Sequence, residues 1–386
     1  MDSESIFRRT DRREGLFRGF LLAFFIYLFF LSIVAMGEGF KGFSAISEAL
    51  LTNVSNPIMG LVIGILATSI LQSSSTTTSI TVGLVASNIL GANSIQIAIP
   101  IIMGANIGTT ITNSLVSMGH ISHSIAFKNA FRAAVVHDIF NILAVAICFP
   151  LEISFHIIEK AAVGITKILT SAHIGGAEFK SPITAITKPV AHTLFDPSEK
   201  TGLLEKLFSP NIAQIIIIII SLCLLFLSLR YIVKLMRKLV VHRTERFFNE
   251  IIFRNAWLAL LFGIILTAIV QSSSITTSLV IPLAAGGILS IEQVFPYTVG
   301  ANIGTTITTL LAALATGSIP ALTVALSHLC FNLFGTVVIM PIKAIREIPI
   351  RLSGMLTNLL MINKFLPLVF ILFVFFGIPI LVLVIS

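Results

Sequence analysis

Two strings of hydroxyl and amide side chains are the residues of this sequence best suited to binding a small ion. QSSSTTTS begins at Gln72, and QSSSITTS begins at Gln271. Apolar stretches flank each string, and each stretch is shorter than the roughly 20 residues that cross a bilayer. We therefore expect each string to join two half-helices in a re-entrant hairpin. Irregular backbone at membrane depth is tolerated only where protein buries it or where it lines a cavity.

A second polar string, GANIGTTIT, occurs at 104–112 and again, letter for letter, at 300–308. Its glycines permit unusual backbone angles and close approach. We therefore expect each copy to break a helix, so that a new half-helix begins at the threonines, whose hydroxyls can cap or coordinate. The threonines concerned are Thr109, Thr110, Thr305 and Thr306.

The chemistry of these strings suits an oxyanion and Na⁺ together. Half-helix N-termini carry partial positive charge and free N–H groups, so they hold anions. Unwound carbonyls, hydroxyls and carboxamide oxygens suit Na⁺. The duplicated region has two cations, Lys128 and Arg132, so an anion there needs other positive charge, which co-bound Na⁺ can supply. A lone serine is better explained by helix packing, but these strings are dense and occur twice.

The elements that position these strings are two copies of one unit. When Gln72 is aligned with Gln271, residues 60–80 and 259–279 are identical at 12 of 21 positions. The GANIGTTIT strings follow, and then VVHDIFNIL at 135 aligns with LSHLCFNLF at 326. Three matched blocks in the same order indicate duplication of a unit.

Composition places this unit in a membrane. The chain has 56% hydrophobic and 11% charged residues, whereas a soluble domain carries roughly 25% charged residues. Apolar runs at 19–34, 212–229 and 366–385 are each near the length of a bilayer-spanning helix. We expect an all-α, multi-pass membrane protein. The net charge of +8 does not indicate a nucleic-acid partner, because basic residues at the edges of apolar segments set orientation.

Basic residues predict opposite orientations for the two copies. The linker before the second copy is basic, so it is expected in the cytoplasm. Arginines before the first helix place the N-terminus in the cytoplasm as well. The first copy then starts outside and the second inside, which is the inverted-repeat arrangement of secondary transporters. The basic residues of the linker are Arg230, Lys234, Arg237, Lys238, Arg243, Arg246 and Arg254.

This interpretation divides the chain into five segments. Two are the transport repeats, at 57–150 and 256–342. The others are an N-terminal segment with the first helix at 1–56, linking helices at 151–255 and C-terminal scaffold helices at 343–386. The linking segment contains the basic linker and a polar outside loop at 171–211. Four prolines are expected to interrupt structure in this loop: Pro182, Pro189, Pro197 and Pro210.

Several motifs resemble those of the type II sodium-dependent inorganic phosphate cotransporter family, including its bacterial members. They are the paired QSSS strings, IMGANIGTTITN, VHDIFN, SIEQVFPYTVGANIGTTIT and SHLCFN. The resemblance implies inorganic phosphate as substrate, Na⁺ as coupling ion and no other cofactor. It also implies a homodimer with elevator-like movement of the hairpin domain, in the plasma membrane, which is the inner membrane for a bacterial member.

The resemblance also assigns polar residues of both copies to two ligand sets. The phosphate set comprises Gln72, Ser73, Ser74, Ser75, Asn106, Gln271, Ser272, Ser273, Ser274 and Asn302. The Na⁺ set comprises Thr109, Thr110, Asp138, Asn141, Thr305, Thr306 and Asn332, and it shares Ser73 and Ser272 with the phosphate set.

Asp138 is the residue we single out for charge coupling. It is the only acid between residues 133 and 149, and its counterpart in the second copy is Leu329. An ionisable group at membrane depth is expensive and indicates function, although a helix-end residue facing water is the alternative. Asn141 lies three residues further on, on the same helical face, so both side chains could offer oxygens to one cation. In the family that the chain resembles, an aspartate here accompanies an additional Na⁺ and electrogenic transport.

The residues alone leave other functions open. Sulfate and arsenate are near-isosteric with phosphate. YTVGAN at 297–302 is similar to a potassium filter, but that filter reads TVGYG and needs a fourfold ring. A serine hydrolase could combine Ser73 or Ser74 with His137 and Asp138, but a duplicated run of equivalent hydroxyls favours coordination over one nucleophile. We therefore expect a transporter and no enzyme.

Overall fold

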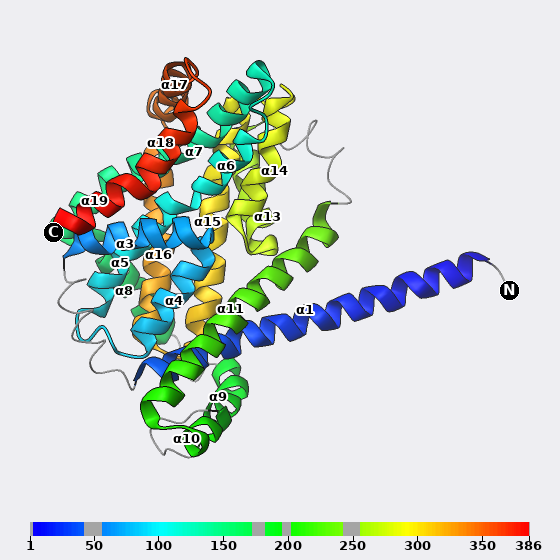
Figure 1. The fold of residues 1–386 in the computed structure, drawn as a ribbon, viewed down its shortest axis with the longest axis vertical. Helices are drawn as coiled ribbons and strands as arrows, with labels where there is room; N and C mark the ends of the chain where they lie inside the picture. The colour runs from blue at the N-terminus through cyan, green and yellow to red at the C-terminus, as the bar shows by residue number, and fades with distance from the viewer. Residues whose placement is uncertain (1–2, 42–55, 172–181, 195–201, 242–254, 386) are drawn as a thin grey trace.

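The computed structural model describes residues 3–41, 56–171, 182–194, 202–241 and 255–385. All regular structure in these ranges is helical (Figure 1). The helices are α1 (Ser3–Lys41), α3 (Pro57–Leu71), α4 (Ser74–Ala86), α5 (Ser94–Thr109), α6 (Ile111–Met118), α7 (Ser124–Phe155), α8 (Ile157–Ser171), α9 (Pro182–Leu194), α10 (Leu203–Leu207), α11 (Pro210–Val241), α13 (Ala256–Val270), α14 (Ser273–Ala285), α15 (Ile291–Thr316), α16 (Ile319–Ile339), α17 (Lys343–Leu360), α18 (Leu366–Leu372), the π-helical turn η2 (Phe373–Gly377) and α19 (Ile378–Ile385).

Seven helical segments of the described chain are long and apolar enough to cross a membrane. They are Phe17–Phe40, Ser94–Met118, Ser124–Phe155, Pro210–Leu235, Ile291–Thr316, Ile319–Ile339 and Leu366–Ile385. Three further apolar helices, α3, α13 and α14, are shorter. The prediction of an all-α membrane protein is confirmed at this level.

The two QSSS strings adopt the same local structure. Gln72 ends α3 in the left-handed region (φ 51°), and Gln271 ends α13 in the same way (φ 60°). Ser73 and Ser272 are extended, and each is the N-cap of the next helix, α4 or α14. The expected pair of short helices at each string is confirmed, but the break is only two residues long. Residues 74–79 already belong to α4.

The expected helix break occurs in the first GANIGTTIT string, at Thr110, but not in the second. α15 passes through 300–308 without interruption, and α5 is interrupted only at Thr110, before α6. The glycines of both strings permit the close approach that was expected of them, within helices that continue past them. A Cβ atom on Gly104 would lie 1.9 Å from the Leu61 carbonyl oxygen, and one on Gly300 would lie 2.0 Å from that of Leu260. Glycine therefore lets α5 touch the backbone of α3, and α15 that of α13.

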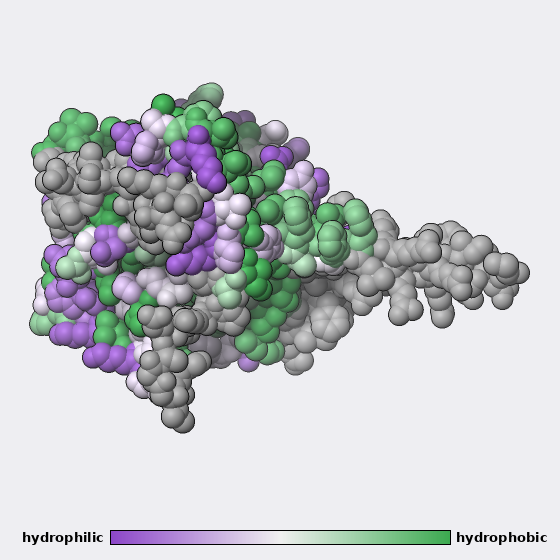
Figure 2. Space-filling view, turned by 90° about the horizontal axis from the view of Figure 1, so that it is seen from below, coloured by the Kyte–Doolittle hydropathy of each residue, from purple (hydrophilic) through white to green (hydrophobic). Residues whose placement is uncertain are grey.

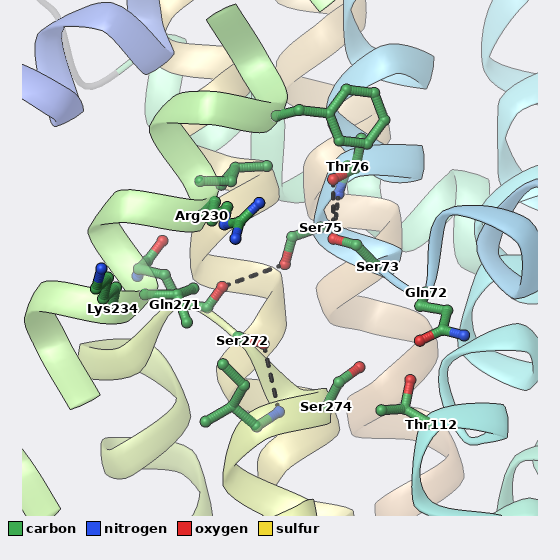
Figure 3. Close-up of a pocket in the computed structure, with 14 residues that line it drawn as sticks. Gln72, Ser73, Ser75, Thr76, Thr112, Arg230, Lys234, Gln271, Ser272 and Ser274 are labelled. Carbon is green, nitrogen blue, oxygen red and sulfur yellow. Dashed lines mark hydrogen bonds between the residues drawn. The ribbon is translucent and has the colours of Figure 1, made fainter. Parts of the chain in front are cut away.

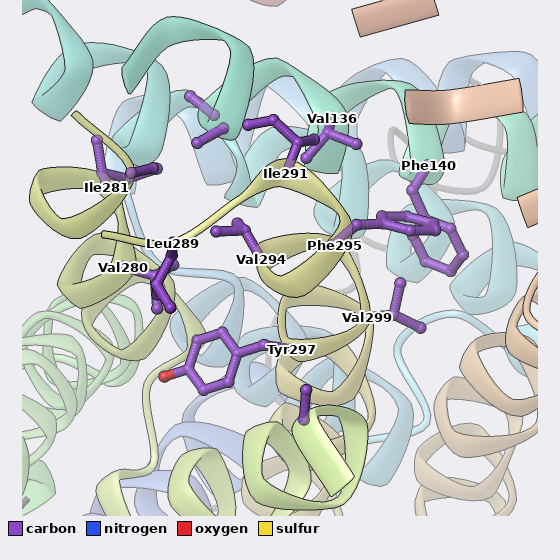
Figure 4. Close-up of a cluster of buried hydrophobic side chains, with 14 of the residues drawn as sticks. Val136, Phe140, Val280, Ile281, Leu289, Ile291, Val294, Phe295, Tyr297 and Val299 are labelled. Carbon is purple, nitrogen blue, oxygen red and sulfur yellow. The ribbon is translucent and has the colours of Figure 1, made fainter. Parts of the chain in front are cut away.

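A hydrophobic cluster holds α15 against α7 and α14 (Figure 4). Phe140 of α7 and Phe295 of α15 pack edge to face, with ring centroids 5.8 Å apart. The buried Tyr297 donates its hydroxyl to the Thr276 carbonyl oxygen at 2.8 Å. These contacts fix α14, the helix that follows the second QSSS turn, on α15.

The linking segment is more helical than expected. The described part of the predicted outside loop contains α9 and α10, and Pro189 lies inside α9 rather than interrupting it. Pro197 lies outside the described residues. This end of the molecule exposes hydrophilic residues between hydrophobic ones (Figure 2).

α11 extends through the first part of the predicted basic linker. Its backbone continues to Val241, so Arg230 and Lys234 are helical residues. Arg243, Arg246 and Arg254 lie outside the described residues. α11 packs along α1, where the rings of Phe25 and Tyr231 stack with centroids 4.6 Å apart.

Candidate functional site

The two QSSS turns face one cavity of about 730 Å³, together with one side of α11 (Figure 3). Segments about 200 residues apart in the sequence thus line the same space. The lining residues are Gln72, Ser73, Ser75, Thr76, Thr112, Phe226, Leu229, Arg230, Val233, Lys234, Gln271, Ser272, Ser274 and Ile275.

Both serine N-caps hold the first turn of a helix that begins at this cavity. The Ser73 hydroxyl oxygen accepts a hydrogen bond from the Thr76 backbone N–H at 3.2 Å. The Ser272 hydroxyl oxygen accepts one from the Ile275 backbone N–H at 3.4 Å. The N-terminus of a helix carries partial positive charge and free N–H groups. The partially positive N-terminal ends of α4 and α14 therefore both lie at the cavity, and this positive potential favours binding of an anion.

Two cations of α11, Arg230 and Lys234, also line the cavity. Figure 3 shows Arg230 directed from α11 toward Ser75 and Gln271. The sequence interpretation placed these cations in a linker and expected the positive charge to come from bound Na⁺. Their spacing could have revealed them, because Phe226, Arg230 and Lys234 recur every four residues and so share one helix face.

The structure brings most residues of the predicted QSSS sites together. Six of the eight line the cavity, whereas Ser74 and Ser273 are buried in the first turns of their helices. The Ser75 hydroxyl donates to the Gln271 carbonyl oxygen at 3.4 Å, which joins the two turns directly. The Gln271 carboxamide donates to the Ala268 carbonyl oxygen of its own turn.

Two of the predicted asparagines, Asn141 and Asn302, belong through their side chains to a separate buried network. Asn302 accepts at Oδ1 from His137 Nε2 (2.8 Å) and donates from Nδ2 to Asn141 Oδ1 (2.6 Å). Asn141 in turn donates to the Asn106 carbonyl oxygen at 2.7 Å. Asn332 bonds within its own helix, to the His328 carbonyl oxygen. The network connects α5, α7 and α15, and His137 is a member that the predicted ligand sets did not include.

Asp138 is buried in the middle of α7, with 2% of its surface exposed. Its Oδ2 accepts from the Ser114 hydroxyl at 3.1 Å, whereas its Oδ1 is buried and has no hydrogen-bond partner. The alternative of a helix-end residue facing water is therefore wrong. Asn141 is engaged by Asn302 and Asn106, so the carboxamide makes no hydrogen bond with Asp138 here. A buried, half-satisfied carboxylate is a favourable place for a cation.

The four predicted threonines bond to backbone carbonyl oxygens and not to one another. Each donates its hydroxyl to a carbonyl oxygen of its own helix, three or four residues earlier. Such bonds satisfy the hydroxyl proton and leave oxygen lone pairs free. The threonines concerned are Thr109, Thr110, Thr305 and Thr306.

The side chains suggested for a hydrolase are not assembled. The Ser73 hydroxyl caps α4. The ring of His137 bonds to Asn302 and lies 3.3 Å from Asn113 Nδ2. Asp138 bonds to Ser114. A nucleophile needs a base in contact with it, and this set provides none.

One other cluster of possible metal ligands occurs in the described chain, at the corner between α7 and α8. Ligand atoms of Glu152, His156 and Glu159 lie within 4.8 Å of one another. The Glu152 carboxylate accepts from the backbone N–H groups of Ile158 (2.6 Å) and Glu159 (3.2 Å). These bonds satisfy the start of α8, so a helix cap accounts for the cluster.

Comparison with known proteins agrees with the site chemistry. Residues 28–174 and 224–364 match the Na⁺/Pi-cotransporter family. The chain is 32% identical over 454 residues to sodium-dependent phosphate transport protein 2B of Homo sapiens, with 95% of this chain and 65% of the relative covered. It is 32% identical over 405 residues to protein 2A of Ovis aries, with 86% and 62% covered.

The chain thus spans slightly less than two-thirds of the length of these relatives. No solved structure matches it significantly. The matched family is one of membrane transporters, and seven candidate spans lie in the described helices. The chain is therefore a multi-pass membrane protein that belongs to the Na⁺/Pi-cotransporter family.

Proposed function

We propose that this protein takes up inorganic phosphate across the plasma membrane, driven by Na⁺. One observation carries the proposal: two helix N-termini and two cations line a single cavity between the QSSS turns. Backbone N–H groups and cations are the partners that a phosphate group needs. The names of the relatives, sodium-dependent phosphate transport proteins, support the same substrate and coupling ion.

Phosphate is bound in this proposal by the QSSS residues of both halves. Gln72 to Ser75 and Gln271 to Ser274 offer hydroxyls, carboxamides and helix N-termini, and Arg230 and Lys234 add charge. Asn302, through its carboxamide, and Asn106, through its backbone carbonyl oxygen, belong to the buried network of Asn141, and we include both asparagines in the phosphate site.

Na⁺ is bound in this proposal next to the phosphate and at Asp138. Ser73 and Ser272 are shared with the phosphate site, and the threonine hydroxyls, Asn141 and Asn332 complete the oxygen ligands. The partnerless Oδ1 atom of Asp138 supports a further Na⁺ there. A carboxylate that carries one more cation per cycle makes uptake electrogenic.

The architecture that we propose is a pair of inverted repeats, 57–150 and 256–342, each with a re-entrant QSSS hairpin. The matched turns at Gln72 and Gln271 support it. The repeats form a transport domain that moves like an elevator against a scaffold. The scaffold consists of 1–56, 151–255 and 343–386, has a cytoplasmic N-terminus and forms a homodimer, in the inner membrane for a bacterial protein.

Uptake into liposomes tests the proposal. Purified protein is reconstituted, and labelled phosphate uptake is measured with an inward Na⁺ gradient and with K⁺ in place of Na⁺. We expect uptake only with Na⁺, and inhibition by arsenate but not by sulfate. Equal uptake with K⁺ would refute the coupling, and greater uptake of sulfate than of phosphate would refute the substrate.

A further inference from the structure

Two buried histidines occupy matched positions in the two halves, and their δ nitrogens have matched partners. His137 Nδ1 lies 3.3 Å from Asn113 Nδ2, and His328 Nδ1 lies 3.0 Å from Thr309 Oγ1. Both rings are 0% exposed. Asn113 and Thr309 each directly follow a GANIGTTIT string. On this side of the rings the two halves are equivalent.

Each of these partners also contacts the hairpin of the other half. Asn113 Oδ1 accepts from the Thr277 hydroxyl at 2.8 Å, and Thr309 Oγ1 lies 2.9 Å from Thr78 Oγ1. Thr78 and Thr277 each lie six positions after the glutamine of their QSSS string (78 − 72 and 277 − 271). The contacts that cross between the halves are therefore equivalent as well.

The ε nitrogens of the two histidines differ. His137 Nε2 lies 2.8 Å from Asn302 Oδ1, in the opposite half. The equivalent partner of His328 would be Asn106, but Asn106 donates to the Ile102 carbonyl oxygen of its own helix. His328 Nε2 is buried and has no hydrogen-bond partner. A buried polar atom in this condition is unfavourable and calls for an explanation.

The neighbouring carboxamides show the same asymmetry. Asn302 donates from Nδ2 to Asn141 Oδ1, so its own Oδ1 is an acceptor and His137 Nε2 carries the proton. The counterpart of Asn141 is Asn332, which donates to the His328 carbonyl oxygen of its own helix at 3.0 Å. His137, Asn302 and Asn141 thus form a continuous hydrogen-bonded bridge between the repeats. Their counterparts His328, Asn106 and Asn332 are present but make no hydrogen bond with one another from side chain to side chain.

We propose that His137 and His328 are positioning residues that act in opposite conformations of the transporter. In the conformation described here, His137 holds Asn302 across the repeats. In the opposite one, His328 holds Asn106, and His137 Nε2 loses its partner. This inference rests on the proposed inverted repeats and adds to the elevator movement a shift of one repeat against the other, because alternating access in inverted-repeat transporters moves one repeat against the other around the site. Each histidine then fixes one asparagine of the proposed phosphate site in one conformation.

The test is a conformational measurement that needs no substrate. A cysteine replaces Val233, which lines the cavity on α11. Its rate of modification by a charged, water-soluble thiol reagent is measured in detergent, with the rate of the three native cysteines subtracted. His137→Ala removes a bond of the conformation described here, in which Val233 lines the cavity, so we expect modification to slow by up to about fivefold, the effect of one hydrogen bond. His328→Ala removes a bond of the opposite conformation, so we expect modification to become faster.

Milder variants separate positioning from packing. His137→Asn and His328→Asn keep an amide near the δ nitrogen and remove the ε contact, so they should repeat the two shifts if an alanine variant fails to fold. His137→Gln and His328→Gln place an amide near the ε nitrogen and should restore the parental rate. Shifts of the same sign for both histidines, or no shift, would overturn the inference. Opposite shifts in a protein that fails to transport phosphate would retain it and reject only the substrate.

Discussion

Replacing Gly104 by alanine tests whether this glycine of the first GANIGTTIT string is needed for close packing of α5 on α3. The new Cβ would lie 1.9 Å from the Leu61 carbonyl oxygen, whereas ordinary contact begins at 3.4 Å. α3 and α5 must therefore separate by about 1.5 Å (3.4 − 1.9). Inserting a methyl group into a packed core costs about 1–3 kcal/mol. We expect the upper end, because the obstacle is backbone that cannot change rotamer.

The displacement also reaches the proposed phosphate site. α3 leads directly into the Gln72 turn, so moving the helix moves a wall of the cavity. A misplacement of about 1 Å can lower a rate by about a hundredfold. We expect Gly104→Ala to unfold at a lower temperature in detergent, measured by size-exclusion chromatography after heating, and to lose most phosphate uptake in liposomes.

Gly164→Ala is the matched control. This glycine lies in α8, and a Cβ there would meet nothing within 4 Å. The control should unfold at the parental temperature or slightly above it, since alanine favours helix. If Gly104→Ala matched Gly164→Ala in both assays, α3 and α5 would be free to separate, and the close-packing explanation would fail.

Three further predictions concern the cavity and the buried acid. Ser73→Ala and Ser272→Ala remove N-caps worth about 1 kcal/mol each, so each should lower phosphate uptake at normal expression. Arg230→Gln and Lys234→Gln should each raise the apparent KM for phosphate about threefold, with less dependence on ionic strength than in the parent, since exposed charges contribute about 0.2–1 kcal/mol. Asp138→Asn should reduce the inward current per phosphate, measured with voltage-sensitive dye in the same liposomes, while retaining some Na⁺-driven uptake.

Control variants outside the cavity make these results specific. Ser318→Ala removes an N-cap whose hydroxyl accepts at 3.4 Å, as that of Ser272 does, but on α16; uptake should stay near the parental rate. Arg351→Gln removes a cation that is 75% exposed on α17 and should leave KM unchanged. Equal effects of cavity and control variants would refute the assignment of the cavity. An unchanged current in Asp138→Asn would show that this carboxylate binds no coupling ion.

The sequence by itself determined the features that depend on neighbouring residues. Hydropathy over some twenty residues indicated three of the seven candidate membrane spans of the described helices, because the bilayer acts on each helix along its own length. The two QSSS turns were predicted because a polar string between short apolar stretches cannot continue either helix through lipid. Internal identity revealed the duplication, and the resemblance of the motifs to those of a known family indicated the family, without any knowledge of how the helices pack.

Contacts between distant segments were decided only by the tertiary structure. Gly104 and Gly300 were predicted to break helices, yet they serve helix contact, because the same lack of a side chain permits both uses and only the neighbouring helix selects one. Arg230 and Lys234 reach the cavity because α11 continues past its apolar run and lies beside both turns. His137 pairs with Asn302, whereas His328 Nε2 has no partner. This difference depends on how one nearly symmetric half packs against the other, and two matching sequences do not determine that packing.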